Sequence, residues 1–318
     1  MRLRPSVWVL CRIIAILSRK SDRRTTGERR ATAGISPAIN KGNRGHIDVS
    51  DHRVPVTGGT INVRAYRPHN ATDPLPAHIL MHAGAFWTGN VTGLDSLARA
   101  YAESVPCLVL SVEYRLAPEF AYPTAAEDSY SALSWAFAHA ANLDIDPTRI
   151  SVGGVSAGGN LAAAVALMAR DRGGPPIVFQ LLELPVVDLT MSRPSVAEFG
   201  TGLALTREAM ITGYRHYLGA PEQAVQPYAS PMLAPDLSGL PPTMILTAEF
   251  DPLRDEGEEY GRRLGAAGVP VQVLRAKGHV HASTHAPKIV RSARRYRMAT
   301  TDALRDAYRT ASRGAAPG

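Results

Sequence analysis

The 318-residue chain is poor in cysteine and contains no recognisable metal-binding or phosphate-binding motif. Its two cysteines, Cys11 and Cys107, lie far apart within apolar sequence, which argues against a disulfide framework and favours a reducing compartment. No Cys and His residues have the spacing of metal ligands, and no glycine-rich loop ends in the Lys-Ser or Lys-Thr pair of a phosphate-binding site. We therefore expect no metal and no cofactor.

A net positive charge is also missing from most of the chain, although the formal net charge of the whole chain is +7. Residues 1–30 contain nine Lys or Arg residues and only two acidic residues, Asp22 and Glu28. This segment therefore carries the whole net charge, and the rest of the chain is formally neutral. Because the basicity is confined to a terminal tail, it does not predict that the folded domain binds nucleic acid.

An apolar run in this tail, Val7 to Leu17, is interrupted by Arg12 and is too short to span a bilayer. A secretory signal would need an unbroken apolar region, and the dense basic block that follows disfavours export. Three interpretations remain, in this order: a disordered leader, a start codon placed too far upstream, or a helix with weak affinity for a membrane surface. We treat residues 1–45 as an N-terminal tail that is partly disordered or contributes to a cap.

From His46 onward, apolar runs typical of strands alternate with longer segments typical of helices. With 45% hydrophobic residues, the chain is long enough to bury a large core. The alternation predicts a mostly parallel sheet with helices on both faces. The expected strands are residues 46–56, 61–68, 77–81, 107–114, 149–152, 177–187, 243–247 and 271–276, and the expected helices are residues 93–105, 123–142, 161–170, 206–218, 255–267 and 288–309.

The segment Gly154-Val155-Ser156-Ala157-Gly158 has the G-x-S-x-G spacing of a nucleophile elbow between a strand and a helix. A strand that turns sharply into a helix strains its apex residue, and glycine on either side avoids clashes. Such a turn would expose the Ser156 hydroxyl at the carboxyl edge of the sheet. It would also place Ser156 at a helix N-terminus, where backbone N–H groups stabilise a developing oxyanion.

Residues 191–231 interrupt the strand–helix alternation and follow the carboxyl end of an expected strand, where folds of this kind place their sites. We expect this insertion to form a cap over Ser156. The core would then consist of residues 46–190 and 232–318.

A serine nucleophile needs a general base, and the base needs an acid that orients it. In hydrolases with this elbow, the order along the chain is Ser, acid, His. Asp251 lies just beyond the strand that begins at residue 243, where the loop faces the site, and is our first choice for the acid. Asp188, at the end of the preceding strand, is the alternative.

The loop after the last expected strand offers three candidate bases, His279, His281 and His285. At least one of them must have another role. In a continuing strand His279 and His281 would share a face, so periodicity does not select between them. A base that reaches out of a loop beyond the strand favours the later of the two, whereas we expect His285 to begin the closing helix.

The segment from His82 to Gly89 follows a buried strand and contains small residues that let the backbone approach a substrate carbonyl. We expect the N–H groups of Gly84, Ala85 and Ala157 to form a three-donor oxyanion hole. Because His82 precedes the nucleophile in the chain, we expect it to hydrogen-bond within this loop rather than act as the base.

These motifs resemble those of the hormone-sensitive-lipase-like esterases, bacterial α/β-hydrolases with an HGGG loop and a GDSAGG elbow. The resemblance covers roughly His46 to His285. Further matching segments are Tyr114-Arg-Leu-Ala-Pro-Glu119 with Tyr122-Pro123, Asp251-Pro-Leu-Arg-Asp-Glu-Gly257, and Gly278-x-x-His281. The last of these selects His281 as the base. The resemblance implies an α/β-hydrolase fold with a helical cap, and ester hydrolysis without a cofactor by a cytoplasmic, often dimeric enzyme.

The sequence departs from this family in four places. The HGGG loop is His82-Ala83-Gly84-Ala85 in this sequence, and if position 85 needs a positive φ, alanine there costs about 1 kcal/mol. Val155 replaces the Asp of the elbow, and Ala282-Ser283 replaces the Gly-Phe that follows the base. Residues 1–30 have no clear counterpart in the family.

The sequence therefore predicts a serine carboxylesterase acting on small-molecule esters. Six Phe and three Trp are a sparse aromatic supply, and no large apolar lid is evident, so short to medium acyl chains are favoured over oil interfaces. Hydrolysis of amides or aryl amides is an alternative, because it passes through the same acyl-enzyme. A non-catalytic ligand-binding protein on the hydrolase scaffold is a third hypothesis.

Overall fold

The computed structural model describes residues 3–9, 11, 46–69, 71 and 74–314. Most of the basic tail, including residues 12–45, lies outside the described residues, so our interpretations of the tail stay predictions. Among the described helices, none combines the length and the apolar character needed to cross a bilayer.

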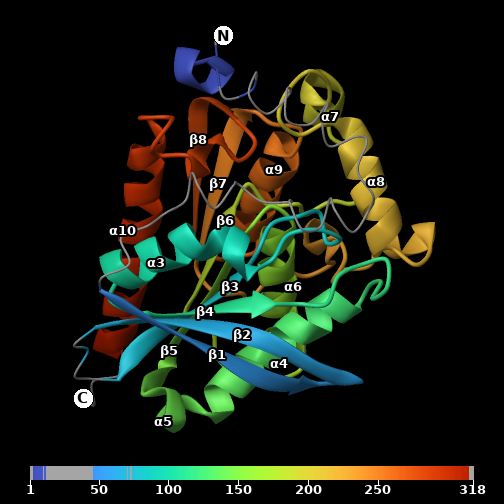
Figure 1. Cartoon of the computed structure of the whole chain (residues 1–318). Helices are drawn as coiled ribbons and strands as arrows, with labels where there is room; N and C mark the ends of the chain where they lie inside the picture. Colours follow the sequence, from blue (N-terminus) through green and yellow to red (C-terminus); the bar gives the residue numbers. More distant parts are fainter. Residues whose placement is uncertain (1–2, 10, 12–45, 70, 72–73, 315–318) are drawn as a thin grey trace.

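Eight strands form one sheet in the order β1-β2-β4-β3-β5-β6-β7-β8 (Figure 1). Strand β2 is antiparallel to both β1 and β4, and all other neighbours pair in parallel. The mostly parallel sheet expected from the sequence is confirmed. The strands are β1 (Ile47–Val56), β2 (Gly59–Pro68), β3 (Leu75–Met81), β4 (Leu108–Glu113), β5 (Ile145–Val155), β6 (Phe179–Glu183), β7 (Thr243–Phe250) and β8 (Val271–Val280).

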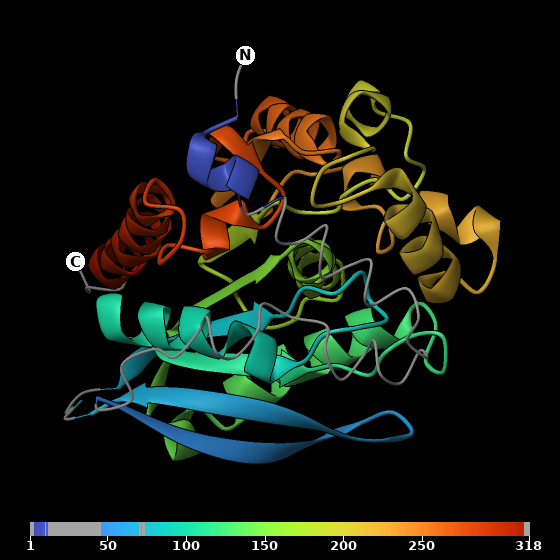
Figure 2. The same cartoon turned by 45° about the horizontal axis from the view of Figure 1, so that its top comes forward.

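Strands β1 and β2 form an antiparallel hairpin at one edge of the sheet (Figure 2). Val56 pairs with Gly59, so Thr57 and Gly58 alone make the turn. Gly58 has φ 77°, the positive value that tight hairpin turns require and that glycine adopts without strain.

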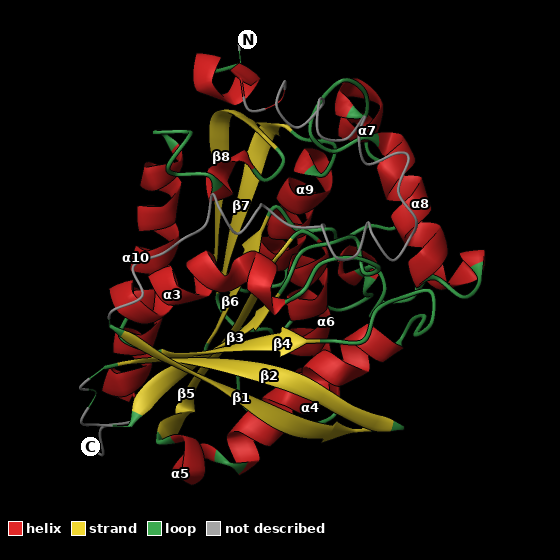
Figure 3. Ribbon diagram, viewed as in Figure 1, coloured by secondary structure: helices red, strands yellow, loops and turns green. Residues whose placement is uncertain are grey.

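Helices cover both faces of the sheet (Figure 3). Helices α3 (Asp95–Ser104) and α10 (Ala293–Gly314) pack on one face, and α4 (Thr124–Ala138), α6 (Ala157–Asp171) and α9 (Arg254–Ala266) pack on the other. Because both faces are covered, the central strands are largely apolar, as in β3, where every residue is buried and all but His78 are apolar.

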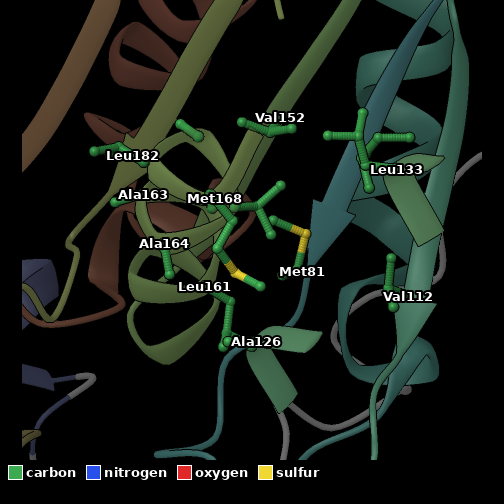
Figure 4. Packing of buried hydrophobic residues seen from close by; sticks show 14 of the residues in the cluster. Met81, Val112, Ala126, Leu133, Val152, Leu161, Ala163, Ala164, Met168 and Leu182 are labelled. Atoms are coloured by element: carbon green, nitrogen blue, oxygen red, sulfur yellow. The ribbon is translucent and has the colours of Figure 1, made fainter. Parts of the chain in front are cut away.

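Helix α6 lies at the centre of the core, and its residues from Ala157 to Ala169 are all buried. Figure 4 shows Leu161 and Met168 among the side chains that pack with Met81 of β3 and Val152 of β5. An Ala/Leu/Met-rich sequence suits this position because small side chains allow close approach and long ones fill the gaps. The packing anchors the residues that immediately precede α6.

Several expected elements have different bounds. The helix expected over 123–142 is divided into α4 and α5 (Ala140–Leu143). Strand β6 stops at Glu183, because Leu184 adopts φ 50° and leaves the extended conformation.

The closing helix begins at Ala293 rather than at residue 288. Pro287 disfavours a helical conformation of Ala286, which has φ −112° and ψ 56°. His285 therefore does not begin this helix, contrary to our expectation. It ends a separate short helix, η4 (Ser283–His285).

The insertion at 191–231 contains helices α7 (Pro194–Phe199) and α8 (Arg207–Tyr217) and a short helix η2 (Pro221–Val225). Thr206 caps α8 by accepting a hydrogen bond from the Ala209 N–H. The two α-helices lie together on one side of the molecule, next to α9 (Figure 1).

Candidate active site

Ser156 occupies the sharp turn between β5 and α6. Its backbone has φ 57° and ψ −115°, a strained conformation for a residue other than glycine. A Cβ atom at Gly154 would lie 2.3 Å from the carbonyl oxygen of Gly158, and one at Gly158 would lie 2.1 Å from that of Met81. Glycine is therefore required at both motif positions, because the turn packs directly on the end of β3.

The structure brings Ser156, His281 and Asp251 together from three separate elements. Nε2 of His281 lies 3.1 Å from Oγ of Ser156, and Nδ1 lies 2.7 Å from Oδ2 of Asp251. Asp251 follows β7 and is fully buried, and its other oxygen accepts a hydrogen bond from the Leu253 N–H. With the proton on Nδ1, the ring can accept the Ser156 proton at Nε2. These are the contacts that a nucleophile, a base and an orienting acid need.

His279 lies inside β8 and has other partners. Its ring nitrogens contact the hydroxyl groups of Ser283 and Ser292, each at 2.8 Å. Burial, with a contribution from the charge of Arg4, lowers the pKa of His279 to about 4. The ring is therefore neutral near pH 7, and both of its nitrogens are occupied away from Ser156.

Asp188, the alternative acid, is buried, and its side chain accepts hydrogen bonds from the loop that follows it. Oδ1 accepts hydrogen bonds from the N–H and the hydroxyl of Thr190, and Oδ2 accepts one from the Ser192 hydroxyl. These contacts fix the start of the cap segment. The carboxylate that contacts His281 belongs to Asp251.

The loop after β3 has positive φ values at consecutive residues. Gly84 has φ 137° and Ala85 has φ 50°. The N–H groups of Trp87 and Thr88 donate to the Gly84 carbonyl at 3.2 Å and 3.0 Å, which closes the loop into a tight turn. Ala85 thus adopts the positive φ that the HGGG pattern reserves for glycine, at the expected cost of about 1 kcal/mol.

His82 stabilises this loop through a ring contact and hydrogen bonds. Its ring stacks on Tyr114 with centroids 4.0 Å apart, and Nδ1 lies 2.9 Å from the Ala83 carbonyl oxygen. The Tyr114 hydroxyl donates to the His82 carbonyl at 2.8 Å. Burial lowers the pKa of His82 to about 4, so the ring is neutral. These contacts agree with the hydrogen-bonding role expected from the sequence.

Helix α8, in the segment predicted to form a cap, contacts the loop after β3 through aromatic side chains. Phe86 stacks on Tyr217 of α8 with centroids 3.8 Å apart, and Trp87 lies 4.8 Å from the ring of His216. The Tyr217 carbonyl also accepts a hydrogen bond from the Tyr122 N–H at 2.7 Å. Sequence reasoning missed this contact, although the aromatic residues near the end of α8 were a usable signal.

A second serine–histidine contact lies deeper in the core. Nδ1 of His78 is 2.8 Å from Oγ of Ser151, which also contacts the Tyr308 hydroxyl at 2.6 Å. All three side chains are buried. Burial lowers the pKa of His78 to about 4. Because Ser151 lies within β5 rather than at its end, we assign this contact to packing of α10 on the sheet.

Potential metal ligands are not grouped in the described ranges: no three His, Cys, Asp or Glu side chains come together in the manner of a metal site.

Comparisons with known proteins agree with this architecture. A family profile described as "alpha/beta hydrolase fold" matches residues 78–285. The carboxylesterase NlhH of Mycobacterium tuberculosis is 43% identical over 224 residues, which span 70% of each chain. The chain belongs to this family. The resemblance to the hormone-sensitive-lipase-like esterases of the α/β-hydrolase superfamily is thereby confirmed.

More distant members of the family support the same placement. An arylesterase of Saccharolobus solfataricus is 37% identical over 246 residues, or 77% of this chain and 79% of that protein. The structure of a hyperthermophilic esterase from the archaeon Pyrobaculum calidifontis superimposes with a TM-score of 0.89 at 36% identity. It covers 96% of this chain and 99% of its own, so the similarity extends over nearly the whole fold.

Proposed function

We propose that this α/β-hydrolase is a serine carboxylesterase acting on esters with short to medium acyl chains. Ser156 would be the nucleophile, His281 the general base and Asp251 the orienting acid. The observation that carries the proposal is the continuous set of contacts from Asp251 through His281 to a serine held in a strained turn. Relatives named carboxylesterase and arylesterase support esters as the substrate class.

In the first step, Oγ of Ser156 attacks the ester carbonyl carbon while its proton moves to Nε2 of His281. The ring becomes an imidazolium, which the buried carboxylate of Asp251 stabilises through Nδ1–H. The carbonyl oxygen becomes an oxyanion. We assign its stabilisation to the N–H groups of Gly84, Ala85 and Ala157.

In the second step, the tetrahedral intermediate collapses and the bond to the leaving alkoxy oxygen breaks. His281 returns its proton to this oxygen, and the alcohol leaves behind an acyl group on Ser156. Water then attacks the acyl carbonyl with His281 again accepting a proton. The second intermediate collapses by breaking the bond to Oγ of Ser156, His281 returns its proton to Oγ, and the carboxylic acid is released.

The test compares two serines that each contact a histidine. Ser156→Ala should lower kcat on p-nitrophenyl acetate by about four orders of magnitude or more and abolish labelling by a fluorophosphonate probe. Ser151→Ala, the matched control at the His78 contact, should retain labelling and most of the activity. Labelling that survives Ser156→Ala would overturn the assignment of the nucleophile.

A panel of p-nitrophenyl esters from acetate to palmitate would define the acyl preference. We expect kcat/KM to be highest for short or medium chains, and a maximum at palmitate would contradict this. Turnover of a matched p-nitroanilide at a comparable kcat/KM would favour the amidase alternative. A folded protein that binds esters without turning them over would favour the ligand-binding alternative.

The remaining proposals rest on the composition of the sequence and on the family resemblance. We propose a cytoplasmic enzyme that forms a homodimer and needs no nucleic-acid partner. Size-exclusion chromatography with light scattering would test the dimer. Co-sedimentation with anionic vesicles would test weak membrane contact by the basic tail.

A further inference from the structure

Glu183 is a buried charged residue that the proposed reaction does not use. It is the last residue of β6 and pairs in register with Val155, the residue before the nucleophile. Its side chain is 3% exposed. Its carbonyl oxygen accepts a hydrogen bond from the Ser156 N–H at 2.9 Å. The backbone of Glu183 thus holds the nucleophile in place.

The side chain of Glu183 contacts the segment that carries the base. Oε2 lies 3.1 Å from Nε2 of His285, and Oε1 accepts a hydrogen bond from the Tyr101 hydroxyl at 2.5 Å. His285 is buried and ends η4, the short helix that begins two residues after His281. Glu183 therefore links the nucleophile through its main chain and the base segment through its side chain.

Glu183 is ionised in this setting. Burial alone raises its pKa, but His285, the charge of Arg297 and the Tyr101 hydroxyl outweigh this effect and hold the pKa of Glu183 at about 2. Arg297 lies 5.6 Å from the centre of the Tyr101 ring. The carboxylate is thus surrounded by groups that favour its charge.

A buried carboxylate is a poor choice for stability alone. Its neighbours in the sheet, Val155 and Leu246, are apolar, and well-packed apolar residues often stabilise such positions as well as a buried ion pair does. The contribution of Glu183 to folding does not explain its charge. Its contact with His285, which holds the segment after His281, explains it better.

We propose that Glu183 is a positioning residue that holds the segment carrying His281 at the correct distance from Ser156. The nucleophile follows β5 and the base follows β8, with β6 and β7 between them in the sheet. Asp251 ties His281 to β7, and the Glu183–His285 contact ties the same segment to β6. Both ties together fix the 3.1 Å contact across which the proton moves.

This inference rests on the proposed ester hydrolysis, and it is tested by Glu183→Gln and His285→Gln. Each should lower kcat on p-nitrophenyl acetate by about tenfold with KM changed less than about twofold, because the proton transfer is misaligned while substrate binding is not. The rate of fluorophosphonate labelling at Ser156 should fall in parallel. The double variant should lose no more than either single variant, because both remove the same contact.

Two controls separate positioning from stability. Tyr308→Phe removes a buried hydroxyl that contacts Ser151 and donates to the Ala77 carbonyl, on the same face of the sheet but away from the elbow. It should lower Tm and leave kcat unchanged. Tyr101→Phe removes the other partner of Glu183 and should lower kcat less than His285→Gln does, because Tyr101 lies outside the base segment.

The outcomes are distinguishable. Unchanged kcat and labelling in folded Glu183→Gln, with only Tm reduced, would overturn the positioning role. If Glu183→Gln does not fold, His285→Gln decides: an unchanged kcat overturns the proposal, and a tenfold loss with unchanged KM supports it. A wild-type protein that neither hydrolyses esters nor reacts with the probe would instead refute the proposed function.

Discussion

Ala85 of the oxyanion loop packs directly against Gly213 of α8. A Cβ atom at Gly213 would lie 2.7 Å from the Ala85 Cβ and 3.1 Å from the Ala85 carbonyl oxygen. The Ala85 methyl group, one of two that distinguish this loop from the HGGG pattern, therefore occupies the space that Gly213 leaves open in α8. The backbone of a proposed oxyanion donor is thus held in part by α8.

We predict that Gly213→Ala lowers kcat on short esters by about tenfold. The added methyl group would push Ala85 away from its position, and small displacements of positioned groups have effects of this size. Helix propensity alone predicts that Gly213→Ala stabilises the protein, because Ala is favoured over Gly in a helix interior by about 1 kcal/mol. A loss of kcat would therefore not be explained by a weaker helix. Steady-state kinetics on p-nitrophenyl acetate would measure the loss.

Two further variants test whether the loss of kcat comes from the contact between Ala85 and Gly213. Ala85→Gly combined with Gly213→Ala should recover part of the lost kcat, because the closer of the two clashes is removed. Gly219→Ala, just after α8, should have little effect, because a Cβ atom there meets only the side chain of Gln223 at 3.4 Å. Equal losses in Gly213→Ala and Gly219→Ala would contradict the proposed contact.

The two histidines near the end of β8 allow a matched test of the base. His281→Gln should lower kcat by about four orders of magnitude while the fold is retained, because no base remains next to Ser156. His279→Gln should retain most of the activity and lower Tm, because the ring only joins Ser283 and Ser292. The opposite result would mean that the base is His279 and that our motif alignment is off by two residues.

The fold and two of the three proposed catalytic residues, Ser156 and Asp251, could be predicted because their requirements are local. The strained turn at Ser156 needs glycine at fixed neighbouring positions, and Asp251 follows a strand whose apolar run is visible in the sequence. The choice between His279 and His281 could not be made from periodicity. It depends on where β8 ends, and the strand continues to Val280, four residues beyond the expected end.

Glu183 and Gly213 could not be predicted, because their roles depend on distant partners. Glu183 contacts His285, 102 residues later in the chain, and nothing in its local sequence indicates a charge-pair position. A run of apolar residues around it predicts only a buried strand. From the sequence alone, Gly213 is only a residue that destabilises a helix. Its contact with Ala85 is visible only once the position of the oxyanion loop is known.

Three histidines that are buried in neutral form each lower the free energy of unfolding as the pH falls from about 7 to about 5. Burial holds the pKa values of His78, His82 and His279 at about 4, below the ordinary value of 6.5. The unfolded chain therefore binds protons first, and stability present above pH 6.5 is lost as the pH falls toward 4. Each histidine contributes about 2 kcal/mol of this loss between pH 7 and 5.

Urea unfolding of the wild type and of His78→Gln at both pH values would measure this effect. The variant should lose about 2 kcal/mol less than the wild type over the same interval, since one of the three histidines is no longer present. Its stability at pH 7 serves as the reference. An identical pH dependence in both proteins would show that His78 does not contribute.

The last prediction concerns the first described residues of the chain. Val7 is fully buried in a cluster with Val280, Ala286, Val290 and Ala293, directly beside the segment that carries the proposed base. The Arg4 N–H donates to the Gly278 carbonyl at 3.3 Å, and its side chain donates to the Lys277 carbonyl. These residues therefore pack on the end of β8.

Val7→Asp should detach this segment, because an unpaired carboxylate cannot stay in an apolar cluster. The loss of buried apolar surface should lower the free energy of unfolding by about 2 kcal/mol and reduce kcat by a few-fold, with the esterase reaction still measurable. Val9→Asp is the matched control, because Val9 lies in the same helical segment but is 46% exposed, and it should change neither quantity. If both variants behave like the wild type, the segment does not support the base, and residues 1–11 can be removed without loss of activity.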